Sequence, residues 1–186
     1  MPDNKLVVSV QTSLDGRVAG PDDVLDWLMV KDELHAHFVA EHRQAGMFLY
    51  GRRTYEGMAG YWPTADEDPD SDHFLVEYST VWKAMPKLVF SRTLESADWN
   101  TTVVRDVEAL ETYRRTADGD LYLLGSGQLI TALAERDLVD AYEIYVHPVA
   151  LGGGRSLLEG LPSRQGLTLT DARTFDGNVV KLEYSR

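Results

Sequence analysis

Gly51-Arg52-Arg53-Thr54-Tyr55-Glu56 and Leu123-Leu124-Gly125-Ser126-Gly127-Gln128 each join an apolar, strand-like run to a segment with a helical pattern. Glycine at such a junction lets an anion come close to the backbone N–H groups at the start of a helix. Arg52 and Arg53 add planar guanidinium groups, each of which can bind two phosphate oxygens. Two such junctions in one small protein predict a ligand with several phosphates, and a nucleotide cofactor is the simplest candidate.

Strand-like and helical segments alternate along most of the chain. Strands are expected at 6–10, 47–50, 87–90, 101–104, 121–124 and 142–146, and helices from about 31, at 53–59, at 73–84, after an Asp106 cap, and after Gly127. The segments 167–175 and 179–184 flank Asp176-Gly177-Asn178 and read as a β-hairpin. The pattern predicts one α/β domain over residues 1–186, with a mostly parallel sheet covered on both faces and an antiparallel C-terminal edge.

The composition excludes several classes of partner and chemistry. The net charge of −12 argues against nucleic acid as a partner, and the absence of cysteine excludes disulfides and thiolate catalysis. The first residues lack the long apolar run of a signal peptide or membrane span, so a cytoplasmic protein without membrane contact is expected.

No metal site is predicted. His35 and His37 are two residues apart, so on a helix they point about 200° apart and cannot chelate one ion. The acidic loop at 65–72 resembles a calcium loop, but Ser71 stands where glycine is needed and Pro69 stiffens the chain, so a solvated loop is the better interpretation.

Ser91-Arg92-Thr93 forms a third polar cluster directly after a predicted strand. Ligands of open α/β sheets bind beyond the carboxyl ends of the strands, so three clusters at three strand ends can face one crevice. An arginine at the third cluster suits a 2′-phosphate, which favours NADP over NAD. Each cluster alone is equally consistent with an ordinary turn, and Gly152-Gly153-Gly154-Arg155 is expected to be a flexible turn.

Aromatic side chains gather near the loops of the first third of the chain. Trp27, Tyr61 and Trp62 stand close in sequence to loops that also carry Asp23, Asp26 and Asp32. An aromatic wall with one carboxylate would hold a flat heterocycle that has N–H donors, although each aromatic residue is also consistent with core packing.

Across nearly its whole length the chain resembles the dihydrofolate-reductase-like superfamily, especially the reductase domain of the bifunctional riboflavin-biosynthesis deaminase-reductase and its stand-alone bacterial relatives. The matching stretches are Ser13-Leu14-Asp15-Gly16, Gly51 to Glu56, Ser91-Arg92-Thr93, Gly125 to Leu129 and His147 to Gly152. The resemblance implies a three-layer α/β/α fold, NADPH-dependent hydride transfer and a homodimer. No deaminase zinc motif is present, so only the reductase half is represented.

The resemblance also implies roles for individual residues. Gly51, Arg52, Arg53 and Thr54 would hold cofactor phosphates, and Ser91, Arg92 and Thr93 would hold the 2′-phosphate end. The pyrophosphate and nicotinamide ribose would lie against Gly125, Ser126, Gly127, Gln128 and Leu129, and the nicotinamide against Val18 and Ala19.

The sequence departs from dihydrofolate reductases at the substrate end. No arginine matches the one that binds the folate tail, and Asp26, Asp32 or Asp23 could supply the acidic group of the first long helix. We expect a reductase of a small nitrogen heterocycle, with 5-amino-6-(5-phosphoribosylamino)uracil as the leading substrate. Asp26 is the candidate for substrate orientation or proton supply, and Trp27, Asp32, Tyr61 and Trp62 for the pocket wall. The alternatives are a dihydrofolate or pteridine reductase and a nucleotide-binding module without turnover.

Overall fold

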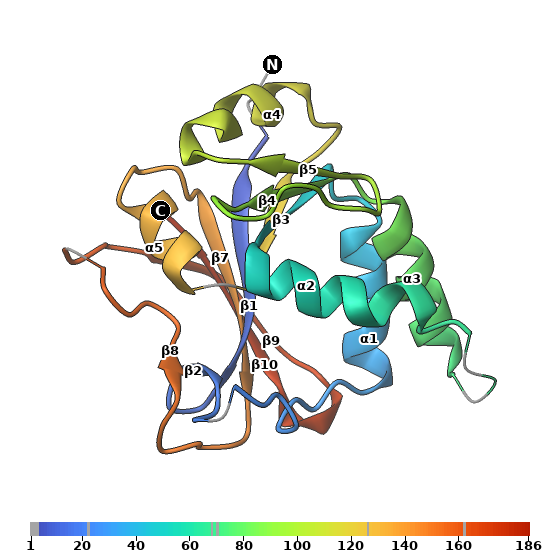
Figure 1. Ribbon diagram of the computed structural model, residues 1–186. Helices are drawn as coiled ribbons and strands as arrows, with labels where there is room; N and C mark the ends of the chain where they lie inside the picture. The colour runs from blue at the N-terminus through green and yellow to red at the C-terminus, as the bar shows by residue number, and fades with distance from the viewer. Residues whose placement is uncertain (1–3, 22, 68, 70, 126, 162) are drawn as a thin grey trace.

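The computed structural model describes residues 4–186 apart from Asp22, Asp68, Asp70, Ser126 and Pro162. A central twisted sheet is flanked by helices on both faces (Figure 1). In chain order the elements are β1 (Leu6–Ser13), β2 (Arg17–Ala19), α1 (Asp32–His42), β3 (Met47–Gly51), α2 (Arg52–Tyr61), η1 (Trp62–Thr64), α3 (His73–Ala84), β4 (Lys87–Phe90), β5 (Thr101–Val104), η2 (Val107–Ala109), α4 (Leu110–Thr116), β6 (Leu121–Leu124), α5 (Gly127–Ala134), β7 (Ala141–His147), β8 (Arg155–Ser156), β9 (Thr168–Thr174), η3 (Asp176–Asn178) and β10 (Val180–Ser185).

The main sheet has eight strands in the order β5-β4-β3-β6-β1-β7-β10-β9. All neighbouring pairs from β5 to β7 are parallel, whereas β10 runs antiparallel to both β7 and β9. The expected mostly parallel α/β sheet with an antiparallel C-terminal hairpin is therefore confirmed.

Two apolar layers hold the helices to the sheet. One face of β1, β3 and β6 packs against α4 and α5, and among its fully buried side chains are Leu6, Leu49, Leu123 and Ile130. The opposite face packs against α1, α2 and α3, where Phe48, Tyr50 and Trp82 form an aromatic core. Parallel strands that are buried on both faces need continuous apolar runs. This explains why the short strands of this sheet can be predicted from the sequence.

The helix expected after Asp106 differs in detail from the prediction. The segment begins as the short 3-10 helix η2 and continues as α4, and the Asp106 side chain makes no capping hydrogen bond. The predicted cap is therefore wrong, although Leu110 does face the core as expected.

A second, two-stranded sheet pairs β2 with β8. Gly154 lies directly before β8 with φ +97°, and a Cβ atom built on it would lie 2.0 Å from the carbonyl oxygen of Ala19. Only glycine lets the two backbones approach this closely. The glycine-rich run expected to be a flexible turn is thus a fixed crossing point that positions Arg155.

The substitution Gly154→Ala is expected to lower the free energy of unfolding by at least about 3 kcal/mol, because it adds a backbone clash to the cost of a positive φ. Gly152→Ala is the matched control, since Gly152 also has a positive φ but no atom within 4 Å of the added Cβ. The free energy of unfolding of this control should fall by only about 1 kcal/mol. Urea unfolding followed by circular dichroism measures both, and equal losses would contradict the proposed close approach.

Candidate functional site

The three polar clusters follow strands that lie side by side. β4, β3 and β6 are consecutive in the sheet and parallel, so their carboxyl ends share one edge. The clusters after β3 and β6 are in contact, because a Cβ atom built on Gly125 would lie 3.1 Å from Cγ2 of Thr54. Gly125 has φ +78°, so glycine here serves both the turn and the contact.

A cavity of about 910 Å³ opens at this edge. Its wall includes residues of all three clusters and of β2, namely Val18, Gly51, Arg52, Arg53, Thr54, Ser91, Arg92, Thr93, Gly127, Gln128 and Leu129. Helix α2 starts at this wall without an acidic residue in its first turn and without a side-chain cap, which leaves its first N–H groups available to an anion. The arginines predicted to bind phosphate therefore meet at one cavity.

The loop after β4 is held in shape by hydrogen bonds. Ser91 Oγ accepts from the backbone N–H groups of Thr93 and Leu94 at 3.3 and 3.0 Å. Arg105 donates from Nη1 to the carbonyl oxygens of Ser91 and Leu94, both at 2.7 Å. These contacts fix the turn that presents Arg92. Arg105 also lines the cavity, a role that the sequence did not indicate.

A smaller cavity of about 270 Å³ adjoins the larger one. Val18, Thr54, Gly127 and Arg155 line both, so the two cavities are continuous. Most of the smaller cavity lies between the sheet and helices α1, α2 and α3, and its wall includes Gln11, His35, Phe38, His42, Met58, Trp62, Tyr78 and Tyr145. Of these residues, the sequence singled out Trp62 as a candidate for the pocket wall; the others were not assigned to a site, because they come from separate elements.

Arg155 stands at the boundary between the two cavities. Its Nε lies 2.9 Å from Oδ1 of Asp23, and both side chains are half exposed. Asp23 has φ +59°, so a left-handed turn directs it toward this ion pair. The pair closes the loop between β2 and α1 against β8.

The residues predicted to bind substrate are dispersed. Trp62 lines the smaller cavity, whereas Trp27 is buried with its ring edge-on to His147 at 5.5 Å between centroids. Asp26 is exposed in a turn, and Asp32 is exposed at the first position of α1. Tyr61 is 51% exposed at the end of α2.

Two predicted cofactor residues also differ from the rest of their group. Ala19 is fully buried in β2 and does not belong to either wall, and Gly125 lines the smaller cavity rather than the larger. The prediction for Ser126 lies outside the described residues.

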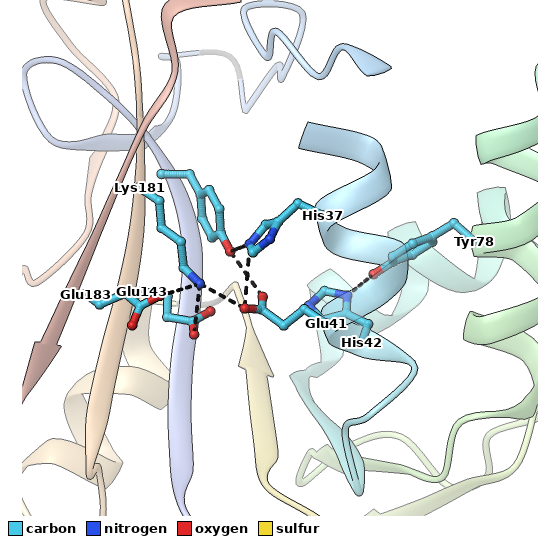
Figure 2. A network of polar contacts seen from close by, with 8 residues as sticks. His37, Glu41, His42, Tyr78, Glu143, Lys181 and Glu183 are labelled. Carbon is cyan, nitrogen blue, oxygen red and sulfur yellow. Dashed lines mark hydrogen bonds and ion pairs between the residues drawn. The ribbon is translucent and has the colours of Figure 1, made fainter. Parts of the chain in front are cut away.

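A buried polar network lies between helix α1 and the sheet (Figure 2). Lys181 on β10 reaches Glu41 at 2.8 Å, Glu143 at 3.2 Å and Glu183 at 2.8 Å. Glu41 Oε2 accepts a hydrogen bond from the Tyr145 hydroxyl at 3.1 Å, and His37 Nε2 lies 2.9 Å from the same hydroxyl. Helix α1 and strands β7 and β10 are thus tied together by charge as well as by apolar packing.

Burial sets the protonation of this network. Burial, together with the negative charge of Glu41, raises the pKa of Glu143 to about 8. Burial also disfavours the charged forms of Glu41 and Lys181. Their contact with each other outweighs this effect and lowers the pKa of Glu41. The same contact, together with the hydrogen bond to Glu183, raises the pKa of Lys181. At neutral pH Glu143 therefore holds a proton in most molecules, which leaves Lys181 with two carboxylates.

His42 and Tyr78 form a second buried pair, joining α1 to α3. His42 Nδ1 lies 2.7 Å from the Tyr78 hydroxyl, and His42 Nε2 has no hydrogen-bond partner among the residues described. Burial lowers the pKa of His42 to about 4, so the ring is neutral at pH 7.

Neither a metal centre nor a membrane span was detected in the described part of the chain. Its histidine, aspartate and glutamate side chains nowhere gather in threes with the spacing that a metal ion needs. None of its helices combines the length and apolar character required to cross a bilayer.

The chain has a dihydrofolate-reductase-like fold. Dihydrofolate reductase from Enterococcus faecalis, complexed with NADP(H), superposes with a TM-score of 0.60 at 11% identity, covering 98% of this chain and 96% of that one. The RibD C-terminal domain model matches residues 4–181, and the chain belongs to this family.

Individual relatives agree with this assignment. The uncharacterized protein YyaP of Bacillus subtilis is 29% identical over 185 residues, covering 97% of this chain and 94% of YyaP. A Shewanella sp. PV-4 protein with a provisional riboflavin-biosynthesis name superposes with a TM-score of 0.74 at 20% identity over 98% of both chains. A third structure superposes with a TM-score of 0.67 at 14% identity, and this chain covers 56% of its length. It is the Thermotoga maritima diaminohydroxyphosphoribosylaminopyrimidine deaminase/5-amino-6-(5-phosphoribosylamino)uracil reductase.

The raised pKa of Glu143 predicts a particular pH dependence of stability. A carboxyl group whose folded pKa exceeds its unfolded value stabilises the fold at low pH, and this contribution is lost between about pH 4.5 and 8 as the pH rises. Glu143→Gln keeps the neutral form, so its stability relative to the parent should rise by about 1 kcal/mol per pH unit between pH 6 and 8.

Urea unfolding at several pH values measures this difference. Glu135→Gln, at an exposed position on the last turn after α5, is the matched control and should follow the parent at every pH. A constant difference between Glu143→Gln and the parent would show that Glu143 is ionised throughout the range.

Proposed function

We propose that this chain is an NADPH-dependent reductase of a small nitrogen heterocycle, related in chemistry to 5-amino-6-(5-phosphoribosylamino)uracil reductase. The observation that carries the proposal is the meeting of Arg52, Arg53 and Arg92, from two separate segments, at one cavity that continues into a smaller aromatic one. Membership of the RibD C-terminal domain family supports it, as do a structural neighbour named for that reductase activity and another complexed with NADP(H).

The residues of the larger cavity fit a dinucleotide phosphate. Arg52 and Arg53 stand at the start of α2, where the backbone N–H groups add to their charge, so we assign them with Thr54 to the pyrophosphate region. Arg92, on the turn braced by Arg105, is assigned to the 2′-phosphate. Arg52 also pairs with Glu56 at 3.1 Å, so Arg53 is the less engaged of the two for a ligand.

The cofactor would supply the hydride, and the chain would bind and orient the reactants. Val18, Thr54 and Gly127, which line both cavities, form the boundary where the nicotinamide and the substrate would meet. With a substrate bound, the apolar residues of the smaller cavity would limit the water at this boundary, which favours transfer to the substrate. Of the carboxylates considered from sequence, Asp23 lines this cavity, so we now favour it over Asp26 and Asp32 for the proton-supplying role.

The homodimer implied by the resemblance and the cytoplasmic location expected from the sequence of the first residues are retained as parts of this proposal. Strand β9 supports a dimer, because it is the edge of the main sheet and all seven of its residues are exposed. Sedimentation velocity measures the association state directly.

Arg53→Ala and Arg92→Ala are each expected to raise the dissociation constant for NADPH at least tenfold, because each removes a charge-assisted contact with a phosphate. Arg92→Ala should in addition reduce the preference for NADPH over NADH. Isothermal titration calorimetry measures both constants. Arg115→Ala, at an exposed position on α4, is the matched control and should bind NADPH like the parent. Unchanged binding in both site variants would remove the cofactor assignment.

Turnover is tested by following NADPH oxidation with aminouracil ribosides, dihydropterins and dihydrofolate. We expect oxidation with the aminouracil or dihydropterin compounds and little with dihydrofolate, since Arg155, the cation that lines the smaller cavity among the described residues, is already paired with Asp23. NADPH binding without oxidation on the whole panel would instead favour a nucleotide-binding module.

A further inference from the structure

The two joined cavities differ sharply in charge. Arg52, Arg53, Arg92 and Arg105 line the larger cavity, and Glu159 is the acidic residue in its wall. Among the described residues of the smaller cavity, the cationic side chain is Arg155, which stands on the shared boundary and is bound to Asp23 at 2.9 Å. Phosphate recognition is therefore concentrated in the larger cavity.

Other cations on the elements around the smaller cavity do not line it. Arg43, just after α1, pairs with Glu77 at 3.1 Å, and Lys83 on α3 pairs with Asp66 at 2.7 Å. The stem of Lys31, just before α1, packs over Gly177, where an added Cβ would lie 3.4 Å from Lys31 Cδ. None of these side chains lines the cavity.

The histidines in the wall of the smaller cavity do not supply a positive charge for a phosphate. Burial lowers the pKa of both His35 and His42, so both rings are neutral at physiological pH. A phosphate dianion transferred into such surroundings loses its hydration without gaining a cation, which is strongly unfavourable.

The inner end of the cavity has the features of a site for a flat ring. Phe38, Trp62, Tyr78 and Tyr145 line it together with His42. His42 is 3% exposed, its Nδ1 is engaged by the Tyr78 hydroxyl, and its Nε2 lacks a partner within the described chain. Because Nε2 is itself shielded from solvent, this end of the cavity presents aromatic surface to a ligand.

We propose that the smaller cavity binds an uncharged, unphosphorylated planar heterocycle between its aromatic side chains. The inference rests on the proposed reductase function and narrows it. It distinguishes this chain from a reductase of phosphoribosylaminouracil, because the cations that suit a phosphate belong to the part of the site assigned to the cofactor.

Matched pairs of ligands test the charge requirement. With the protein saturated by NADP⁺, calorimetry compares 5-amino-6-ribosylaminouracil with its 5′-phosphate, riboflavin with FMN, and 6-hydroxymethyldihydropterin with its diphosphate. At least one unphosphorylated compound should bind, and it should bind at least tenfold more tightly than its phosphorylated partner. Tighter binding of a phosphorylated compound, or no binding of any unphosphorylated one, would overturn the proposal.

A charge added to the rim provides an independent test. Leu25 lines the smaller cavity and is 51% exposed, so Leu25→Lys adds a cation without burying it. The variant should bind the phosphorylated member of a pair at least fivefold more tightly than the parent does. Val24→Lys is the matched control, because Val24 is the neighbouring residue, is 48% exposed and does not line the cavity. Equal affinity of the two variants for the phosphorylated ligand would contradict the proposal that the smaller cavity lacks a cation for a phosphate.

NADPH titration without substrate shows separately whether the reductase assignment holds.

Discussion

The parallel alignment of β4, β3 and β6 is the constraint on which the site depends. Gly51 at the end of β3 is paired with Phe90 at the end of β4, so Arg52 and Ser91 leave the sheet at the same level. β6 lies on the other side of β3, and its following glycine contacts Thr54. A slip of one residue in any of these strands would turn its buried side chains to the wrong face, so the core fixes the register and with it the convergence of the polar clusters.

The same arrangement explains how an acidic protein can bind an anion. The chain carries a net charge of −12, yet five arginines from four segments line one cavity. Helix α2 adds its N-terminal dipole there without an acidic residue in its first turn. The acidic surroundings also disfavour anions elsewhere on the surface, which makes the arginine-lined edge the selective place for a phosphorylated ligand.

The sequence predicted the strands and helices best where a local hydrophobic pattern marks their ends. The bounds expected for β4, β5, β6 and α3 agree with those observed, because short buried strands and amphipathic helices carry local patterns. The pairing of β2 with β8 has no such signal: strands of three and two residues come together only through a backbone crossing at Gly154. The smaller cavity was missed for a related reason, since its wall combines residues from α1, α2, α3, β1 and β7, whose packing the local pattern does not specify.

The buried network clarifies why the inner cavity is apolar despite the charges of this network. Tyr145 contributes to the cavity wall, but its hydroxyl is already engaged by Glu41 and His37. Lys181 is surrounded by carboxylates, so its charge is compensated within the network and does not attract a ligand. Burying such a cluster is costly, and the cost is offset only when its polar atoms find partners within the network. The network thus fixes α1 against β7 and β10 while directing its polar groups inward. Substrate recognition in the smaller cavity therefore depends on its aromatic side chains, and the charges of the network take no part in it.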